Sequence, residues 1–255
     1  MKDVKQECIE KNYNKEHKLR QSGEIFRLFN RIAYRYDLTN HILSFGQDIY
    51  WRKKLIQQID MSIEGKDFYL LDLATGTGEV LRSFRNIYPE QRCAVGIDFA
   101  VEMLKVGFEK YNYNRDRDFF VVMDILNLGI DSDSVDVVTM AFGIRNVSEI
   151  SMALNEIFRV LKPGGQLLIL EFGLPQKGLW RKAYLFYLRY ILPCLGGALT
   201  GCFSSYHYLT ETICKFPSHN RFLQILTEEG FVKTQWTEFN GGAVLLYSGY
   251  KPKNS

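Results

Sequence analysis

The stretch that decides the fold is residues 68–79, which read FYLLDLATGTGE. Its first part, 68–74, is short and almost continuously apolar, as expected of a strand buried on both faces of a parallel sheet. Gly76 and Gly78 follow, and because neither carries a Cβ they allow a tight turn and a close approach of the backbone to a ligand. A helix after this turn would direct its first N–H groups into the crevice outside the strand ends.

The same alternation of apolar run, turn and helical stretch continues along the chain. Further apolar runs span residues 93–98, 119–124, 135–141 and 166–172. The clearest helical stretch follows Ser148, its expected N-cap, and ends at the KPGG of residues 162–165. This alternation predicts an α/β fold with a doubly wound, mostly parallel sheet.

The two ends of the chain depart from this rhythm. Residues 1–20 carry mixed charge, which predicts a flexible arm, and helical patterning over 21–66 predicts a cover beside the sheet. Near the other end, runs over 231–239 and 243–249 are joined by Asn-Gly-Gly, a tight-turn signal between antiparallel strands. We therefore expect a single domain over 21–255 that finishes with an antiparallel hairpin.

Size, charge and cysteine usage exclude several classes of protein. A chain of 255 residues with 46% hydrophobic residues can bury one large core. The net charge of +3 is mild and forms no basic stripe, so we expect no nucleic-acid partner. The five cysteines form no CxxC pair and the four histidines lack ligand spacing, so we expect no metal site. The charged N-terminus is no secretory signal, which favours a cytoplasmic protein.

Residues 184–203 are apolar enough to be tested as a membrane span. Arg189, Pro193 and the Gly196–Gly197 pair interrupt them, whereas a span needs about 20 predominantly apolar residues. We therefore predict a broken helical segment within a helical cover over 174–217, lying above an apolar site. The basic residues of this segment would attract anionic lipid, which predicts transient contact with the inner membrane surface.

Three aspartates end successive apolar runs. Asp72, Asp98 and Asp124 follow one another at equal intervals of 26 residues. A parallel sheet collects the carboxyl ends of its strands on one rim, where Asp98 can accept both hydroxyls of a ribose and Asp124 can meet a purine edge. Each of them alone would more commonly cap a turn or a helix. Together with the glycine turn, they favour a nucleoside site.

The identity of the nucleoside depends on two positions. A dinucleotide-binding turn reads GxGxxG, and its third glycine is Leu81 here. Asp72 precedes the turn, where a negative charge disfavours a pyrophosphate but suits a cofactor with an amino group and a sulfonium. S-adenosylmethionine is therefore favoured as the cofactor, and a NAD-dependent oxidoreductase is the alternative.

Longer stretches carry a more specific signal. They are FNRIAYRYDLTNHILSFG (29–46), WR (51–52), DLATGTGE (72–79), GIDFAVEML (96–104), AFGIRNV (141–147), RVLKPGGQLLILEF (159–172) and YHYLTETICKFP (206–217). They resemble the ubiquinone/menaquinone biosynthesis C-methyltransferases, demethylmenaquinone methyltransferases among them, a branch of the class I S-adenosylmethionine-dependent methyltransferases. The resemblance covers nearly all of residues 26–252 and implies a seven-stranded, Rossmann-like sheet with its last strand antiparallel.

The resemblance also implies which residues hold the cofactor. Family positions match Thr77, Asp98, the Asp124–Ile125 pair and Ala141, the last standing where a serine is common. Joined to the residues read from the strand ends, the expected cofactor site consists of Asp72, Gly76, Thr77, Gly78, Asp98, Phe99, Asp124, Ile125 and Ala141.

The implied reaction moves the sulfonium methyl to a ring carbon of a prenylated quinol, foremost demethylmenaquinol to menaquinol; another lipophilic acceptor is the alternative. Because a ring carbon is a weak nucleophile until its hydroxyl ionises, Arg145 is expected to stabilise the phenolate and Asn146 to bind a quinol oxygen. The base stays open between Asp37, Glu171, Tyr206 and water.

Two of these residues have plainer interpretations. Without the resemblance, Arg145 would be assigned to a salt bridge and Asp37 to a helix N-cap. The helical cover would follow the prenyl tail, and a homodimer is left open as a further partner.

Overall fold

The computed structural model describes residues 36–60, 67–90, 93–110 and 117–253, preceded by Gly23, Arg27, Asn30, Ala33 and Tyr34. The arm predicted over 1–20, and most of the helical pattern predicted between it and residue 36, lie outside the described residues. Residues 36–43 are helical, as the predicted cover requires.

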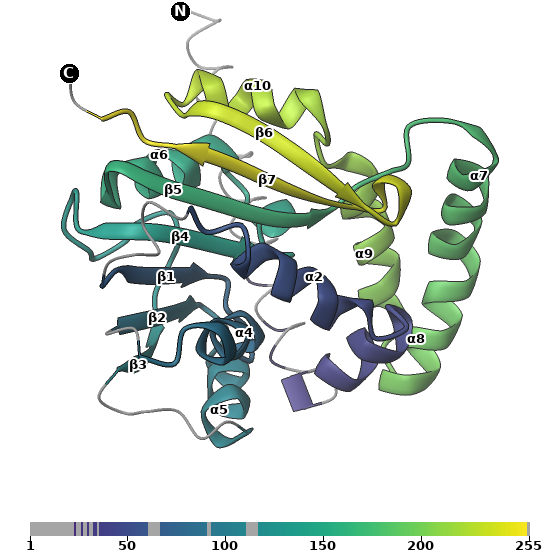
Figure 1. Ribbon diagram of the computed structural model, residues 1–255. Coiled ribbons are helices and arrows are strands. Elements are labelled where there is room, and N and C mark those ends of the chain that lie inside the picture. Colours follow the sequence, from purple (N-terminus) through teal and green to yellow (C-terminus); the bar gives the residue numbers. More distant parts are fainter. Residues whose placement is uncertain are drawn as a thin grey trace, which may run out of the picture.

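A seven-stranded sheet forms the centre of the domain (Figure 1). Its strands are β1 (Tyr69–Leu73), β2 (Cys93–Asp98), β3 (Asp118–Val122), β4 (Val135–Ala141), β5 (Leu161–Phe172), β6 (Val232–Phe239) and β7 (Val244–Tyr250). They lie in the order β3-β2-β1-β4-β5-β7-β6. Neighbours from β3 to β5 are parallel, and β7 is antiparallel to both β5 and β6. The doubly wound fold and its terminal antiparallel hairpin are thus confirmed.

Helices follow or flank the strands. They are α2 (Gln47–Ile56), α4 (Glu79–Ile87), α5 (Val101–Lys110), η1 (Ile144–Asn146), α6 (Ile150–Val160), α7 (Gly178–Phe186), η2 (Tyr187–Ile191), α8 (Leu192–Thr200), α9 (Phe203–Lys215), α10 (Asn220–Glu228) and η3 (Asn240–Gly242). Alternating side chains of the central strands bury both faces of the sheet. Leu167 and Ile169 of β5 pack with α6 and α10 on one face, and Leu168 and Leu170 pack with α2 and α4 on the other.

Three predicted boundaries are wrong by a few residues. Helix α6 is capped at Glu149, which makes no side-chain capping bond, and not at Ser148. Strand β5 begins at Leu161, before the KPGG stretch, because Leu161 already pairs with Val135 of β4; residues 162–165 of β5 then lie opposite the single residue Asp136, where the register shifts. Strand β3 ends at Val122, so Asp124, predicted to end that strand, lies in the following turn.

Helices α7, α8 and α9, with the π-helical turn η2, stand beyond the carboxyl ends of the parallel strands (Figure 1). The segment 184–203 stays helical through Arg189, Pro193 and the Gly196–Gly197 pair, so the break expected at those residues is wrong; the helix ends at Gly201, at φ 73°. Gly196 lets α8 pack on α9, since a Cβ there would lie 2.5 Å from the Tyr206 ring. Within the described ranges, no helix is both long and apolar enough to cross a bilayer.

Candidate active site

Two adjoining cavities lie at the carboxyl ends of the parallel strands. The smaller, about 230 Å³, is bounded by the turns after β1, β2, β3 and β4. The larger, about 480 Å³, is bounded by residues 36–52, by α7 to α9 and by the turn between β6 and β7. Tyr36, Arg52, Phe142 and Asn146 line both cavities, so a group that passes from one to the other crosses the boundary these four side chains form.

Most of the predicted cofactor residues line the smaller cavity. They are Gly76, Thr77, Asp98, Phe99, Asp124, Ile125 and Ala141. The Asp98 carboxylate accepts the backbone N–H groups of Gly76 and Ala100, each at 2.8 Å, and thereby holds the glycine turn against the end of β2. Burial raises the pKa of Asp98, and these hydrogen bonds oppose the rise. Asp124 likewise accepts the N–H of Leu126 at 2.9 Å, so both aspartates close turns and also face the cavity.

The other two predicted cofactor residues lie beneath the wall. Gly78, at φ 78°, is the N-cap of α4 and does not line the cavity. Asp72 is fully buried, and Thr139 donates a 2.7 Å hydrogen bond to its Oδ1. Its Oδ2 is buried without a hydrogen-bond partner in the described part of the chain. Burial raises the pKa of Asp72 to about 7.

Two glycines outside the turn give the smaller cavity its shape. Leu81 stands where a dinucleotide-binding turn has its third glycine, and the space for it comes from Gly96 of β2, whose Cβ would lie 2.8 Å from Leu81 Cδ1. Gly107 of α5 supports the turn from outside, because a Cβ there would lie 2.7 Å from the carbonyl oxygen of Thr77. Helix α4 and strand β2 therefore still pack closely, although the glycine that permits this contact lies in the strand and not in the helix.

The ends of β1 and β4 approach each other in strained backbone. Ala74 and Phe142, each the residue after its strand, have φ values of 51° and 58°, in the left-handed region that residues with a Cβ rarely adopt. The two turns nearly touch, because a Cβ on Gly143 would lie 2.5 Å from the Ala74 Cβ. Strain of this kind persists where the surrounding structure imposes it, commonly at functional sites.

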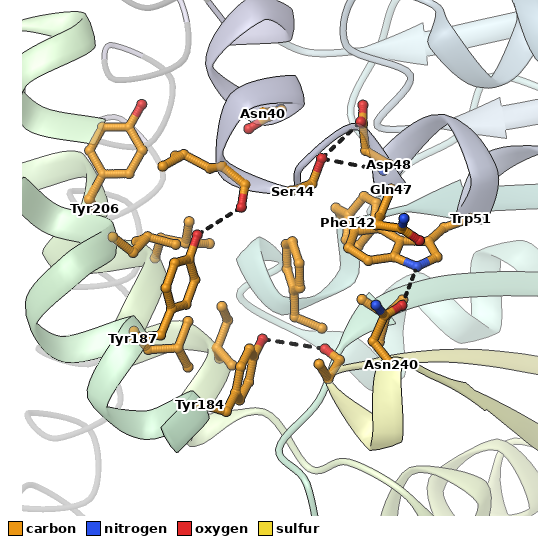
Figure 2. A pocket seen from close by; sticks show the side chains of 18 of the residues that line it. Asn40, Ser44, Gln47, Asp48, Trp51, Phe142, Tyr184, Tyr187, Tyr206 and Asn240 are labelled. Carbon is orange, nitrogen blue, oxygen red and sulfur yellow. Dashed lines mark hydrogen bonds between the residues drawn. The ribbon is translucent and has the colours of Figure 1, made fainter. Parts of the chain in front are cut away.

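Aromatic rings line much of the larger cavity (Figure 2). Their polar atoms bind protein groups at the wall: Trp51 Nε1 donates to Asn240 Oδ1 at 2.9 Å, and the Tyr187 hydroxyl donates to the Leu43 carbonyl at 2.7 Å. The Tyr184 hydroxyl makes a longer bond, 3.4 Å, to a backbone carbonyl. A ligand in this cavity therefore meets mainly ring faces and aliphatic groups.

Arg145 is the predicted catalytic cation, and it lines the larger cavity. Its Nη1 lies 2.6 Å from Glu171 Oε1 and donates to the Phe142 carbonyl at 2.6 Å. The plainer interpretation, a salt bridge, is therefore also present. Its Nε is buried and has no partner among the described residues. Glu171 is fully buried and also accepts the Phe172 N–H, so this carboxylate orients Arg145 and is not available as a base.

The remaining predicted catalytic residues are divided. Asn146 accepts a 3.2 Å hydrogen bond from Tyr208 and lines both cavities. Tyr206 lines the larger cavity, and burial raises the pKa of its hydroxyl. Asp37 lines neither cavity, because its carboxylate accepts hydrogen bonds from Thr77 Oγ1 at 2.7 Å and from Lys110 Nζ at 2.8 Å. The structure thus brings Arg145, Asn146 and Tyr206 together and leaves Asp37 outside the cavity.

The sequence reasoning missed three of the four shared side chains, Tyr36, Arg52 and Phe142. Arg52 and Phe142 fall within the stretches 51–52 and 141–147 that carried the family resemblance, which was a usable signal. Tyr36 was assigned only to a helix face. Burial raises its pKa, and the charges of Arg145 and Arg52 both oppose that rise.

The fold and the smaller cavity define a class I S-adenosylmethionine-dependent methyltransferase. A carboxylate at the end of β2 suits the ribose, and Phe99 and Ile125 suit a purine. The chain belongs to the ubiE/COQ5 methyltransferase family, whose model matches residues 14–251. It is therefore a C-methyltransferase of ubiquinone/menaquinone biosynthesis type, and the NAD-dependent alternative is wrong.

Individual relatives agree with this assignment. The ubiquinone/menaquinone biosynthesis C-methyltransferase UbiE of Geotalea daltonii is 39% identical over 237 residues, which make up 92% of this chain and 99% of the relative. The demethylmenaquinone methyltransferase of Thermus thermophilus is 36% identical over 225 residues, 88% of this chain and 100% of the relative. A solved S-adenosylmethionine-dependent methyltransferase of Thermotoga maritima shares the fold, with a TM-score of 0.60 at 15% identity over 89% of this chain and 99% of that one.

Proposed function

We propose that the acceptor is a prenylated naphthoquinol and that the reaction converts demethylmenaquinol to menaquinol. The observation that carries the proposal is the larger cavity, which is walled by aromatic rings and, among the described residues, meets the cofactor cavity at four side chains. An aromatic quinol with an apolar tail matches such a wall. The Thermus thermophilus relative, named demethylmenaquinone methyltransferase, supports the naphthoquinol over the benzoquinol.

Arg145 has the position to stabilise the phenolate form of the acceptor. The cofactor, when bound, supplies an electrophilic methyl group on sulfur. The Arg145 guanidinium is already held by Glu171 and the Phe142 carbonyl, so it needs little reorganisation when negative charge develops on the ring oxygen. Asn146, on the boundary between the cavities, is suited to bind a quinol oxygen and to align the ring carbon with the methyl group.

The contacts of the candidate residues narrow the choice of the base that removes the ring proton. Glu171 is fully buried in its pair with Arg145, and Asp37 is held by Thr77 and Lys110. Tyr206 faces the cavity, but burial raises its pKa, so its hydroxyl stays protonated near neutral pH. We therefore propose that water, the remaining candidate, accepts the ring proton.

Contact with a membrane surface is the second part of the proposal. The outer face of α7 to α9 exposes Leu179, Phe186, Tyr190, Ile191, Leu195, Leu199 and Phe203. Lys182 and Arg189 are exposed beside them, and each would contribute about 1 kcal/mol at an anionic surface. We expect co-sedimentation with vesicles of anionic lipid, and less of it for a Phe186→Ser, Tyr190→Ser variant. Vesicle binding that is unchanged in the double variant would contradict the proposal that this face contacts the membrane. The homodimer stays a prediction, which analytical ultracentrifugation would test.

A methyl-transfer assay tests the acceptor. The protein is incubated with S-adenosylmethionine and chemically reduced demethylmenaquinone, with the matching benzoquinol in parallel, and the products are identified by mass. One added methyl on the ring carbon of the naphthoquinol, at higher kcat/KM than on the benzoquinol, is the expected result. Equal or better methylation of the benzoquinol would overturn the preference. No product on either quinol, with cofactor binding intact, would mean another lipophilic acceptor.

A further inference from the structure

The charges around the cofactor cavity are unbalanced. Glu79, Asp98 and Asp124 line it, whereas Arg52 is the one cationic side chain on its wall within the described residues. S-adenosylmethionine carries two positive groups, the sulfonium and the α-amino group, and one negative group, the α-carboxylate. A carboxylate removed from water needs a donor or a cation, because leaving a charge unpaired in a cavity costs several kcal/mol.

Arg52 is held so that part of its guanidinium stays available. It projects from α2 and is 6% exposed, and its Nη1 donates a hydrogen bond to Asp48 Oδ2 at 2.7 Å. Asp48 also accepts bonds from Ser44 Oγ at 2.9 Å and from the His41 ring at 2.8 Å. Burial alone would raise the pKa of Asp48, but Arg52 and these hydrogen bonds hold it below its usual value, so the carboxylate stays ionised.

The rest of the Arg52 guanidinium faces the boundary between the cavities. Its Cζ lies 5.9 Å from the centre of the Phe142 ring, which also lines both cavities. Within the described part of the chain, no donor of this guanidinium other than Nη1 makes a hydrogen bond. A guanidinium has five N–H donors in a planar fork that suits a carboxylate.

We propose that Arg52 binds the α-carboxylate of S-adenosylmethionine and that Asp48 is the positioning residue that orients it. Arg145 does not line the cofactor cavity, and Lys110 is engaged by Asp37 and Glu79. The inference depends on the cofactor of the family and not on the proposed acceptor. Arg52 also lines the larger cavity, so a quinol oxygen is its rival ligand, and the experiment has to separate the two.

The test compares two cofactors by isothermal titration calorimetry in the absence of quinol. S-adenosylmethionine and its decarboxylated analogue share the sulfonium and the amino group and differ in the carboxylate. A charge-assisted hydrogen bond predicts that the wild-type protein binds S-adenosylmethionine about 10- to 100-fold more tightly than the analogue. In the variant Asp48→Asn, Arg52→Gln, which leaves no buried charge unpaired, we expect this preference to disappear.

Matched variants locate the effect in the guanidinium. Asp48→Asn alone keeps Arg52 but removes the carboxylate that orients it, so the preference for the carboxylate should fall to an intermediate value. Lys53→Gln removes one charge from the exposed side of the same helix and should keep the full preference. If the double variant weakens both cofactors equally, or keeps the full preference, the proposal is wrong. A double variant that binds both cofactors as the wild type does, but shows a raised KM for the quinol, would assign Arg52 to the acceptor instead. Circular dichroism confirms that each variant is folded.

Discussion

The two cavities of this methyltransferase are built in different ways. The cofactor cavity is formed mainly by turns at the ends of four neighbouring strands, where the backbone N–H groups of Gly76 and Ala100 are held by Asp98. The cavity proposed for the acceptor is formed by side chains from segments far apart in the chain, around residues 36–52, 142–146, 172–213 and 240–244. The cavity assigned to the cofactor thus rests on the sheet, and the cavity proposed for the acceptor adds helices to two strand ends.

The two regions also differ in how they are attached to the sheet. Much of the cover packs on itself, with α8 against α9 through Gly196. Its hydrogen bonds to the rest of the domain include those of Tyr184 to Ala243 and of Tyr187 to Leu43. Substitutions in one region should therefore leave the ligand of the other largely unaffected, and the predictions below test that separation.

The largest effect is expected from Arg145, on the acceptor side. Arg145→Ala should lower kcat by about 100-fold or more, because a preorganised stabiliser of the phenolate is lost. The Kd for S-adenosylmethionine should change by no more than about 3-fold, since Arg145 does not line the cofactor cavity. Single-turnover kinetics and calorimetry measure the two quantities separately.

The control for Arg145 concerns its partner. Arg145→Ala alone leaves the carboxylate of Glu171 buried without its cation, which by itself destabilises a protein. Arg145→Met combined with Glu171→Gln removes both charges and should show the same loss of turnover with a smaller loss of melting temperature. Equal losses in kcat and in cofactor affinity would contradict the separation of the two cavities.

The cofactor side was largely predictable from the sequence, for a physical reason. Parallel strands bring their carboxyl ends to one rim, so Asp98 and Asp124 are placed by strand order alone once the apolar runs are recognised. The sequence did not predict how deeply each side chain is buried, because the pattern does not distinguish a side chain on the cavity wall from one beneath it. Asp72 and Gly78 lie beneath it, and Gly96 and Gly107, which shape the cavity, belong to no turn motif.

The acceptor side was predictable only as a region. The aromatic segment indicated a cover, but which side chains face the cavity depends on how four helices pack, and no local pattern encodes that. Glu171 shows the difficulty, because its pairing with Arg145 joins the end of β5 to the turn after β4. Arg52 and Phe142 needed the same knowledge of the fold, although they stood in conspicuous stretches.

The cofactor cavity is tested next, through Gly107. A Cβ there would lie 2.7 Å from the carbonyl oxygen of Thr77, a backbone atom that cannot move without shifting the glycine turn. Gly107→Ala should therefore weaken S-adenosylmethionine binding about 10-fold, as overpacking by one methyl group commonly costs 1–3 kcal/mol. The quinol KM should not change. Gly129→Ala is the control, since its Cβ would meet only the Met123 side chain, at 3.6 Å. Equal effects of the two substitutions on cofactor binding would contradict the role assigned to Gly107.

A smaller effect is expected at Asp37, which links the N-terminal helical residues to the cofactor turn. Its carboxylate accepts bonds from Thr77 and from Lys110, whose side chain is 42% exposed. Because solvent screens such a pair, Asp37→Asn should raise the cofactor Kd by only about 3-fold, less at high salt. Lys105→Gln, on the same helix but paired with Glu102, should have no effect. If Asp37→Asn instead lowers kcat at saturating cofactor, Asp37 becomes a candidate for the base again.

The last effect concerns stability and not a ligand: a pH dependence set by Asp72 beneath the cofactor turn. Its pKa rises from 3.8 to about 7 on folding, chiefly through burial, so the folded protein binds a proton more tightly than the unfolded chain does. Its contribution to stability is therefore full below about pH 4 and declines as the pH rises to 7. Asp72→Asn removes this decline, so the melting temperature of the cofactor-free variant minus that of the wild type should increase between pH 5 and pH 8, by on the order of 5 °C. A constant difference across that range would show that Asp72 is ionised throughout and that burial does not raise its pKa.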